Sequence, residues 1–226
     1  MSTIRGYSCA DLQEQCVRQI VQKCYRTLDG LLRIPGENFE DTIECPTVAL
    51  VTDTPLADCR FIKDTRKLPF SQQFMDKYAH DLLEGTVANF VYDYHDRLFN
   101  WGGEFLTCDG SVGINQLKYV VSKLQKSVVT RRAIATTWYP HIDELHDDVP
   151  CLQLVQFKIR DGKLHMLVMF RSEDMLLGLG PNMYGLTTLQ ADIAEQVGVP
   201  VGTYEHVCTC PHLYYWRDQQ YLEQFK

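Results

Sequence analysis

Two apolar runs joined by an Asp-Gly turn are the feature that most constrains how this chain can fold. The runs cover residues 152–159 and 164–170, and the second is the best apolar run in the sequence. Between them, Asp161-Gly162 is a residue pair that favours the tight turn of a β-hairpin. The sequence therefore predicts two adjacent antiparallel strands, the second of them buried in a sheet.

Other segments alternate between helix and strand in an irregular order. Apolar residues recur with helical spacing over residues 9–29, 74–83, 117–124 and 183–197. Short β-branched runs predict further strands at residues 47–52, 133–138 and 203–207. Because this order lacks the βαβ alternation of a doubly wound fold, we expect an α+β fold in which helices cover a mixed sheet. No stretch has the composition of a linker, so residues 1–226 are predicted to form a single domain.

The charge of the chain disfavours some classes of partner. Lysine and arginine total 22 against 29 aspartate and glutamate residues, which gives a formal net charge of −7. This balance argues against a general nucleic-acid coat or a polybasic membrane binder. No window approaches the roughly 18 consecutive apolar residues of a membrane helix. We therefore expect a soluble protein whose main partner is neither a membrane nor a nucleic acid.

The chain has an unusual number of cysteines. They lie at positions 9, 16, 24, 45, 59, 108, 151, 208 and 210. Their number is odd, their spacing is irregular, and the N-terminal residues lack the apolar stretch of a secretory signal. We expect reduced thiols in a cytoplasmic protein rather than a disulfide framework. We therefore hypothesise that one of the cysteines is a nucleophile and that the others serve as small apolar residues.

Two groups of residues carry the side chains of a metal site without its spacing. His206, Cys208, Cys210 and His212 alternate along one stretch, and in a strand they would share one face, which is too linear for a tetrahedral cage. The acidic stretch 141–148 precedes a proline turn, where a solvated loop is the ordinary interpretation. The sequence therefore predicts no metal site.

Arg131, Arg132 and Cys151 are the first candidates for a ligand site. Two consecutive arginines before the predicted strand 133–138 offer paired guanidinium groups that suit a phosphate, although surface salt bridges are the commoner explanation for such a pair. Cys151 follows Pro150 at the start of a strand, where a side chain has a defined direction, but a buried structural thiol is the default for a single cysteine. What distinguishes Cys151 is the spacing of the residues around it.

That spacing closely resembles the thymidylate synthase family. The matching residues begin with Arg131-Arg132 and Trp138 and continue through Pro150-Cys151-x4-Gln156, Arg171-Ser172-x-Asp174-x3-Gly178-x3-Asn182 and His212-Leu213-Tyr214. They extend over residues 131–214, and many polar residues at fixed separations are far more specific than one motif. The resemblance implies a thymidylate-synthase-like mixed sheet covered by helices, and a homodimer formed through the face of that sheet.

The resemblance also implies catalytic and base-reading roles. Cys151 matches the nucleophile whose thiolate adds to C6 of the pyrimidine of dUMP. Arg171 matches the arginine that contacts both the nucleotide phosphate and the thiol, and its charge favours the thiolate. Tyr94 is a candidate for the network that removes the C5 proton, with a core tyrosine beside a loop as the equal alternative. Asn182 would pair with N3–H and O4 of uracil, which points to dUMP rather than a cytosine nucleotide.

The remaining matches imply contacts with the substrate and the co-substrate. Arg131 and Arg132 match the arginines that reach the phosphate in the neighbouring subunit's site. Ser172 matches a further phosphate contact, and Gln156 matches a residue that helps place the nucleotide. His212 and Tyr214 match the residues that hydrogen-bond the deoxyribose 3′-hydroxyl. Asp174 and Gly178 match positions near the pterin ring. The implied co-substrate is 5,10-methylenetetrahydrofolate or methylenetetrahydromethanopterin.

The reaction that the resemblance implies is the reductive methylation of dUMP to dTMP. The reduced pterin supplies both the carbon and the hydride, and the protein supplies orientation. An alternative with the same covalent steps lets water trap the exocyclic methylene and gives a hydroxymethylpyrimidine nucleotide. A third hypothesis is a catalytically silent regulator that binds a nucleotide or RNA. The presence of Cys151, Arg171 and Asn182, together with the net charge, disfavours this third hypothesis.

Two departures from the family pattern resemble its short archaeal-type branch. Leu152 follows the nucleophile where familiar members have histidine, and most of the small folate-packing segment is missing. The general-acid glutamate of the family has no secure counterpart, and its candidates are Tyr78, Asp81 and Glu84. The phosphate-binding arginine of the N-terminal half has the candidates Arg60 and Arg66.

Overall fold

A computed structural model describes residues 1–26, 32–35, 41–86, 93–102 and 113–226. Its main element is a six-stranded sheet with the order β1-β4-β9-β7-β6-β5. The strands are β1 (Ser2–Arg5), β4 (Val48–Thr52), β5 (Ala133–Thr136), β6 (Leu152–Arg160), β7 (Lys163–Phe170) and β9 (Val201–Cys208). The pairs β1–β4 and β7–β9 are parallel, and the other neighbours are antiparallel. The predicted mixed sheet is therefore confirmed.

The predicted hairpin lies inside this sheet, between β9 and the edge strand β5. Strands β6 and β7 pair from Leu152 and Phe170 down to Arg160 and Lys163. At the turn, Asp161 has φ 50° and Gly162 has φ 70°. Positive φ at both central residues is the geometry of the type I′ turn that matches the twist of the two strands. The Asp-Gly pair thus sets the register of the strand that follows Cys151.

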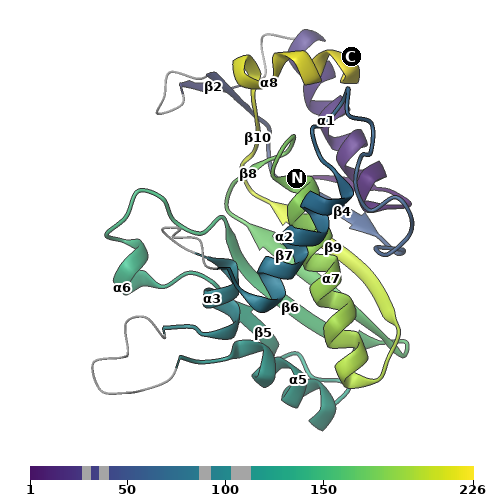
Figure 1. The fold of residues 1–226 in the computed structure, drawn as a ribbon, viewed down its shortest axis with the longest axis vertical. Coiled ribbons are helices and arrows are strands. Elements are labelled where there is room, and N and C mark those ends of the chain that lie inside the picture. The colour runs from purple at the N-terminus through teal and green to yellow at the C-terminus, as the bar shows by residue number, and fades with distance from the viewer. Residues whose placement is uncertain (27–31, 36–40, 87–92, 103–112) are drawn as a thin grey trace.

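Helices cover one face of the sheet. The four helices are α1 (Cys9–Arg26), α2 (Gln72–Glu84), α5 (Gln116–Lys126) and α7 (Leu179–Val197). Helix α7 packs on β7 and β9, α1 on β1 and β4, α5 on β5, and α2 against α7 (Figure 1). All four lie at predicted helical segments, and residues 27–29 of the first prediction lie outside the described residues. The Gly-rich segment 101–113, whose composition predicts a loop, falls mostly outside them, since residues 103–112 are not described.

Polar caps and glycines set the ends of these helices. The Ser8 hydroxyl accepts a hydrogen bond from the Asp11 amide at the start of α1. Gly85 ends α2 at φ 87°, and Gly198 ends α7 in the left-handed conformation at φ 73°. Glycine adopts such angles at little cost, so the helix ends are encoded locally.

The two faces of the sheet differ in burial. Along β6, β7 and β9, buried residues alternate with partly exposed ones, as expected when one face packs on helices. The buried residues join one connected apolar cluster beneath α1, α2 and α7. The opposite face carries the partly exposed residues Leu154, Gln156, Leu167, Met169 and Val207. The sheet therefore has a helix-covered face and an open face.

A second, smaller sheet was not predicted from the sequence. It has the order β2-β3-β10-β8 and contains β2 (Leu32–Pro35), β3 (Asp41–Glu44), β10 (Pro211–Tyr214) and β8 (Glu173–Asp174). Strands of two to four residues carry too little alternation to be recognised. The short strand β1 escaped prediction for the same reason. The pairing of Asp174 with His212 brings two distant candidate segments together.

Three short helices complete the described chain. They are α3 (Tyr94–Phe99), α6 (Pro140–Asp143) and α8 (Tyr215–Leu222), followed by a 3-10 turn at Glu223–Phe225. Among the helices that the structure describes, none is both long enough and apolar enough to cross a membrane.

Candidate active site

Arg171 holds the segment that leads into Cys151. Its Nε donates to the Pro150 carbonyl at 3.1 Å, and its Nη2 donates to the Val149 carbonyl at 2.7 Å. The Arg171 amide also donates to the Cys151 carbonyl at 2.8 Å. Because a charged donor strengthens such bonds, one guanidinium group fixes the backbone just before the Cys151 thiol. The predicted pair of Cys151 and Arg171 therefore lies together at the start of β6.

Tyr94 contacts the same segment from α3. Its hydroxyl accepts a hydrogen bond from the Leu152 amide at 3.1 Å, one residue after Cys151. Its ring meets Phe170 edge-on, with centroids 6.4 Å apart. Asp93 caps α3 by accepting from the His95 amide at 2.7 Å, so the first turn that carries Tyr94 is held in place. The structure brings Tyr94 to the backbone that carries the candidate nucleophile.

A buried ion pair supports this segment from the other side. Arg97 and Asp143 are both buried, and two bonds of 3.0 and 2.7 Å join them. Arg97 also donates to the carbonyl of Thr137, whose hydroxyl donates to the Leu152 carbonyl. The prediction that Asp143 belongs to a solvated acidic loop was therefore wrong. Its partner lies 46 residues away, beyond the reach of a local pattern.

Asn182 lies in the first turn of α7 with both ends of its amide engaged. Its Oδ1 accepts a hydrogen bond from the Tyr78 hydroxyl of α2, and its Nδ2 donates to Glu173 Oε1 at 2.8 Å. Of the three general-acid candidates, Tyr78 is thus in contact with Asn182. Asp81 pairs with Lys77 at 2.5 Å.

Ser172, His212 and Tyr214 form one group across the small sheet. The Ser172 hydroxyl lies 3.3 Å from Nδ1 of His212, and the rings of His212 and Tyr214 meet edge-on at 5.1 Å. Ser172 directly follows Arg171, so this group continues from the Cys151 segment. Hydroxyl, imidazole and phenol groups can donate to a phosphate, and they can either donate to or accept from a sugar hydroxyl.

Asp174 and Gly178 shape the turn before α7. Asp174 accepts from the amides of Leu176 and Leu177 at 3.0 Å and pairs with Arg217 at 2.5 Å. A Cβ atom at Gly178 would lie 2.9 Å from the Asp174 carbonyl oxygen, so this position has no room for a side chain. The two residues lie together at the end of β8, where α7 begins.

Arg131, Arg132 and Gln156 lie apart from Asn182. Gln156 is on the open face of the sheet, and its amide donates to the Arg131 carbonyl at 3.4 Å. Both arginines are exposed, and with Lys123 and Lys126 they line a surface hollow of about 370 Å³. Asn182, by contrast, belongs to α7 on the helix-covered face. Within one copy of the chain, Gln156 and Asn182 therefore lie on opposite faces of the sheet, and the two arginines lie at its β5 edge, beside α5.

The two arginine candidates of the N-terminal half have different surroundings. Arg66 is exposed and pairs with Asp64 at 2.8 Å. Arg60 packs on α7, where its guanidinium lies 4.0 Å above the Tyr184 ring and donates to the Thr187 hydroxyl at 2.7 Å. Burial lowers the pKa of Arg60. The described contacts thus tie Arg60 to α7 and Arg66 to Asp64.

Burial separates Cys151 from the core thiols. Cys9 and Cys208 are buried, and burial raises the pKa of both, that of Cys9 to about 12. Cys151 is only partly buried and follows two carbonyls that Arg171 binds. A thiolate reacts and a buried thiol is inert. Cys151 is therefore not a buried core thiol, a feature that it shares with Cys59 and Cys210.

His206 and Glu173 form a buried pair. Glu173 Oε2 lies 2.6 Å from His206 Nε2, and Nδ1 of His206 lies 2.9 Å from the Tyr204 hydroxyl. The alternating residues 206–212 do not share a strand, since β9 ends at Cys208 and β10 begins at Pro211. Among the described residues, no three of His, Cys, Asp and Glu are grouped to hold a metal ion. Glu173 is the unspecified position of the Arg171-Ser172-x-Asp174 motif, and no local pattern in the sequence marks it as a candidate.

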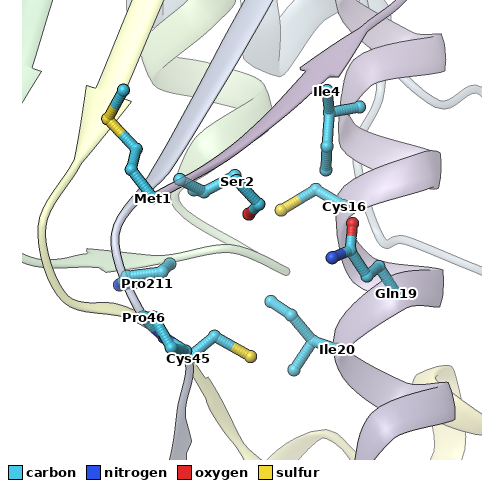
Figure 2. Close-up of a pocket in the computed structure, with 10 residues that line it drawn as sticks. Met1, Ser2, Ile4, Cys16, Gln19, Ile20, Cys45, Pro46 and Pro211 are labelled. Atoms are coloured by element: carbon cyan, nitrogen blue, oxygen red, sulfur yellow. The ribbon is translucent and has the colours of Figure 1, made fainter.

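A separate cavity lies at the β1 edge of the sheet. Figure 2 shows it between α1 and the start of β1, with Cys16 and Cys45 among the side chains around it. Its volume is about 280 Å³. Strands β4, β9 and β7 lie between β1 and the strand that follows Cys151. The cavity therefore lies away from Cys151, although Pro211 at its edge directly precedes His212.

Comparisons with known proteins establish the family. The family model described as thymidylate synthase matches residues 71–226. The chain belongs to the thymidylate synthase family. Within it, the chain is 44% identical over 168 residues to a protein of Methanocaldococcus jannaschii named "Putative thymidylate synthase", covering 72% of this chain and 73% of that one. A protein of the same name from Methanosarcina barkeri is 38% identical over 182 residues, covering 80% and 78%.

Proposed function

We propose that this protein methylates dUMP at C5 to give dTMP, with a reduced pterin as co-substrate. This makes it a methyltransferase of nucleotide biosynthesis. The observation that carries the proposal is the partly buried Cys151 thiol at the start of β6, preceded by two carbonyls that Arg171 binds. Membership of the thymidylate synthase family supports the same conclusion.

Cys151 would make C5 of uracil reactive. C5 is not nucleophilic by itself, and addition of the Cys151 thiolate at C6 gives an enolate that can attack a one-carbon iminium. The guanidinium of Arg171 favours the thiolate by its charge. Tyr94 lies one backbone amide away from Cys151, so its hydroxyl is suitably close to take part in removing the C5 proton. Each residue thus has a defined part in a covalent mechanism.

Asn182 would read the base, and the small-sheet group would hold the sugar and the phosphate. An amide offers an acceptor for N3–H and a donor for O4 of uracil. Ser172 would bind the phosphate, and His212 and Tyr214 the 3′-hydroxyl. Their mutual contacts, 3.3 Å between Ser172 and His212, support a common site.

The pterin would lie near Asp174 and Gly178. Its bound form would supply the carbon and the hydride, with 5,10-methylenetetrahydrofolate and methylenetetrahydromethanopterin as the two carriers that fit this chemistry. The Asp174 carbonyl oxygen fills the space beside the Gly178 Cα, so the two residues form one compact turn that would lie against the pterin. Comparing the two carriers at equal concentration in one assay identifies the natural one.

A homodimer would complete each site. The open face carries partly exposed apolar residues, including Leu154, Leu167 and Met169, and a surface of this kind is suited to a partner sheet. Arg131 and Arg132 precede the edge strand β5, next to Gln156 of the open face, and from there they would reach the phosphate site of the partner. Gln156, beside Arg131, would help place the nucleotide from the same side. We propose that a single domain of this chain acts as such a dimer in the cytoplasm.

Mixing two inactive variants tests the shared site. Cys151→Ser and Arg132→Ala are each expected to lose activity alone. After subunit exchange, the mixed dimer has one site with both residues intact, and about a quarter of the wild-type activity should return. No recovery in a mixture shown by mass spectrometry to contain mixed dimers would contradict the shared site.

Product analysis tests the reaction itself. The protein is incubated with dUMP and 5,10-methylenetetrahydrofolate, and the nucleotide products are separated and identified by mass spectrometry. The proposal predicts dTMP and an equal amount of oxidised pterin, because the hydride comes from the pterin. A 5-hydroxymethyl product without pterin oxidation would identify the water-trapping alternative and contradict the proposal. No product with either carrier would favour a silent nucleotide-binding regulator.

A further inference from the structure

We propose that Glu173, held by His206, fixes the orientation of the Asn182 amide and so makes the site select a uracil nucleotide over a cytosine nucleotide. This inference rests on the proposed function, in which Asn182 reads the base. Glu173 would then be a positioning residue that acts through Asn182.

The buried contacts around Glu173 carry this inference. Glu173 is 3% exposed and His206 is 0% exposed. The two carboxylate oxygens have different partners: Oε2 lies 2.6 Å from His206 Nε2, and Oε1 accepts from Asn182 Nδ2 at 2.8 Å. His206 is held in turn, since its ring stacks on Phe170 at 4.7 Å and its Nδ1 lies 2.9 Å from the Tyr204 hydroxyl. Glu173 is thus fixed by groups on β9 and β7.

The proton between Glu173 and His206 leaves Oε1 as an acceptor. If the proton is on His206 Nε2, the carboxylate is ionised and both of its oxygens accept. If the proton is on Glu173 Oε2, it donates to His206 Nε2 and Oε1 is a carbonyl oxygen. In each arrangement Oε1 carries no hydrogen and can only accept. A donor must therefore face Oε1, and the Asn182 amide turns its Nδ2 toward Glu173.

The contact of Asn182 Oδ1 with Tyr78 is compatible with this orientation of the amide. The Tyr78 hydroxyl donates to Asn182 Oδ1, although a hydroxyl can also accept. Tyr78 alone would therefore tolerate either orientation of the amide. Glu173 is the contact that excludes the flipped orientation, because flipping would set Asn182 Oδ1 against the acceptor Oε1 inside the protein. Two acceptors in contact without water are unfavourable.

The fixed amide distinguishes the two pyrimidines. Asn182 Oδ1 keeps a second lone pair that can accept from N3–H of uracil, and Nδ2 keeps a second hydrogen for O4. Cytosine presents the reverse pattern, with N3 as an acceptor and the 4-amino group as a donor. Asn182 could match cytosine only after a flip, which Glu173 opposes. A site that leaves buried polar groups unpaired rejects the wrong ligand strongly.

Binding of dUMP and dCMP to Glu173→Gln tests this inference. The Kd of each nucleotide is measured by calorimetry without a pterin, so no turnover is required. In this variant the side-chain amide can present either a donor or an acceptor to Asn182, which removes the penalty for the flip. We expect wild type to prefer dUMP, and Glu173→Gln to reduce the ratio of the two affinities at least tenfold. The ratio of the two affinities is the useful readout, because the loss of a merely structural contact would weaken the binding of both nucleotides by the same factor.

Two matched variants sharpen the result. Glu195→Gln removes an exposed carboxylate from the same helix as Asn182 and should leave the ratio unchanged. His206→Gln keeps a group that can donate to Oε2 and should retain the preference for dUMP. If circular dichroism shows that Glu173→Gln is unfolded, His206→Leu replaces it, since loss of the partner of Oε2 frees either oxygen to carry the proton. The expected result for His206→Leu is then a lower ratio of dUMP affinity to dCMP affinity than in wild type.

The outcomes separate this inference from the proposed function. If wild type prefers dUMP and a folded Glu173→Gln keeps the wild-type ratio, the positioning role is overturned while the proposed function stands. If both affinities of the variant fall by the same factor, the role of Glu173 is structural only. If wild type binds neither nucleotide, the proposed function and this inference fail together.

Discussion

Cys151 and Cys208 lie on either side of the same strand end but in opposite surroundings. Phe170 at the end of β7 pairs with Cys208 of β9 and with Leu152, the residue after Cys151. Cys208 is fully buried, and burial, followed by the charge of Glu173, raises its pKa. Cys151 is partly buried, and the guanidinium of Arg171 binds the two carbonyls before it. Two thiols that flank the same strand end thus differ in burial and in the charged groups near them.

The largest expected effect comes from removing the partly buried thiol. Cys151→Ser should lower kcat for dTMP formation by more than about 1,000-fold, because a hydroxyl ionises far less readily than a thiol at neutral pH. Cys210→Ser, at a partly buried cysteine after Cys208, is the matched control and should keep kcat within about twofold. Equal losses in both variants would remove the distinction between the cysteines.

Replacing the arginine beside Cys151 should have a smaller effect. Arg171→Lys keeps the charge but loses the two-nitrogen contact with the carbonyls of Val149 and Pro150, so kcat/KM should fall by about 100-fold. Arg5→Lys is the control, since Arg5 is exposed on the edge strand β1 and lies 3.9 Å from Asp53. Activity of Arg171→Lys close to that of the control would show that charge alone suffices.

The smallest expected effect concerns a core thiol and appears as pH dependence of stability. The pKa of Cys9 is raised to about 12, so as pH rises above 9 the unfolded thiol ionises while the folded one stays protonated. The free energy of unfolding therefore decreases as pH rises from about 9 to about 12. Between pH 9.5 and 11, the free energy of unfolding of wild type should fall more steeply than that of Cys9→Ala, by about 1.4 kcal/mol per pH unit. Parallel slopes in urea titrations would contradict the burial of Cys9.

Local signals predicted the elements that carry the Cys151 site. Asp161-Gly162 identified the hairpin, and helical spacing identified α7, so the strand after Cys151 and the helix with Asn182 followed from the sequence. Asp143 was assigned to a solvated loop because its partner Arg97 is remote in the sequence. Contacts of this kind are formed by packing, and no local pattern reports them.

The choice among Tyr78, Asp81 and Glu84 needed the packing of two helices. All three lie on α2, and the sequence does not say which side of that helix meets α7. The structure turns Tyr78 toward Asn182, and Asp81 pairs with Lys77. Glu173 was missed because its burial depends on His206 from another strand. Contacts between polar residues that are distant in the sequence are therefore the part of the site that could not be predicted from the sequence.

The most direct test of the account is the mass of the protein after incubation with 5-fluoro-dUMP and 5,10-methylenetetrahydrofolate. Fluorine at C5 cannot leave as a proton does, so the covalent complex should persist. We predict a mass increase equal to both small molecules, located by peptide mapping at Cys151 and absent from Cys151→Ser. An adduct that persists in Cys151→Ser, or that maps to Cys208 or Cys210, would contradict the assignment of Cys151 as the nucleophile.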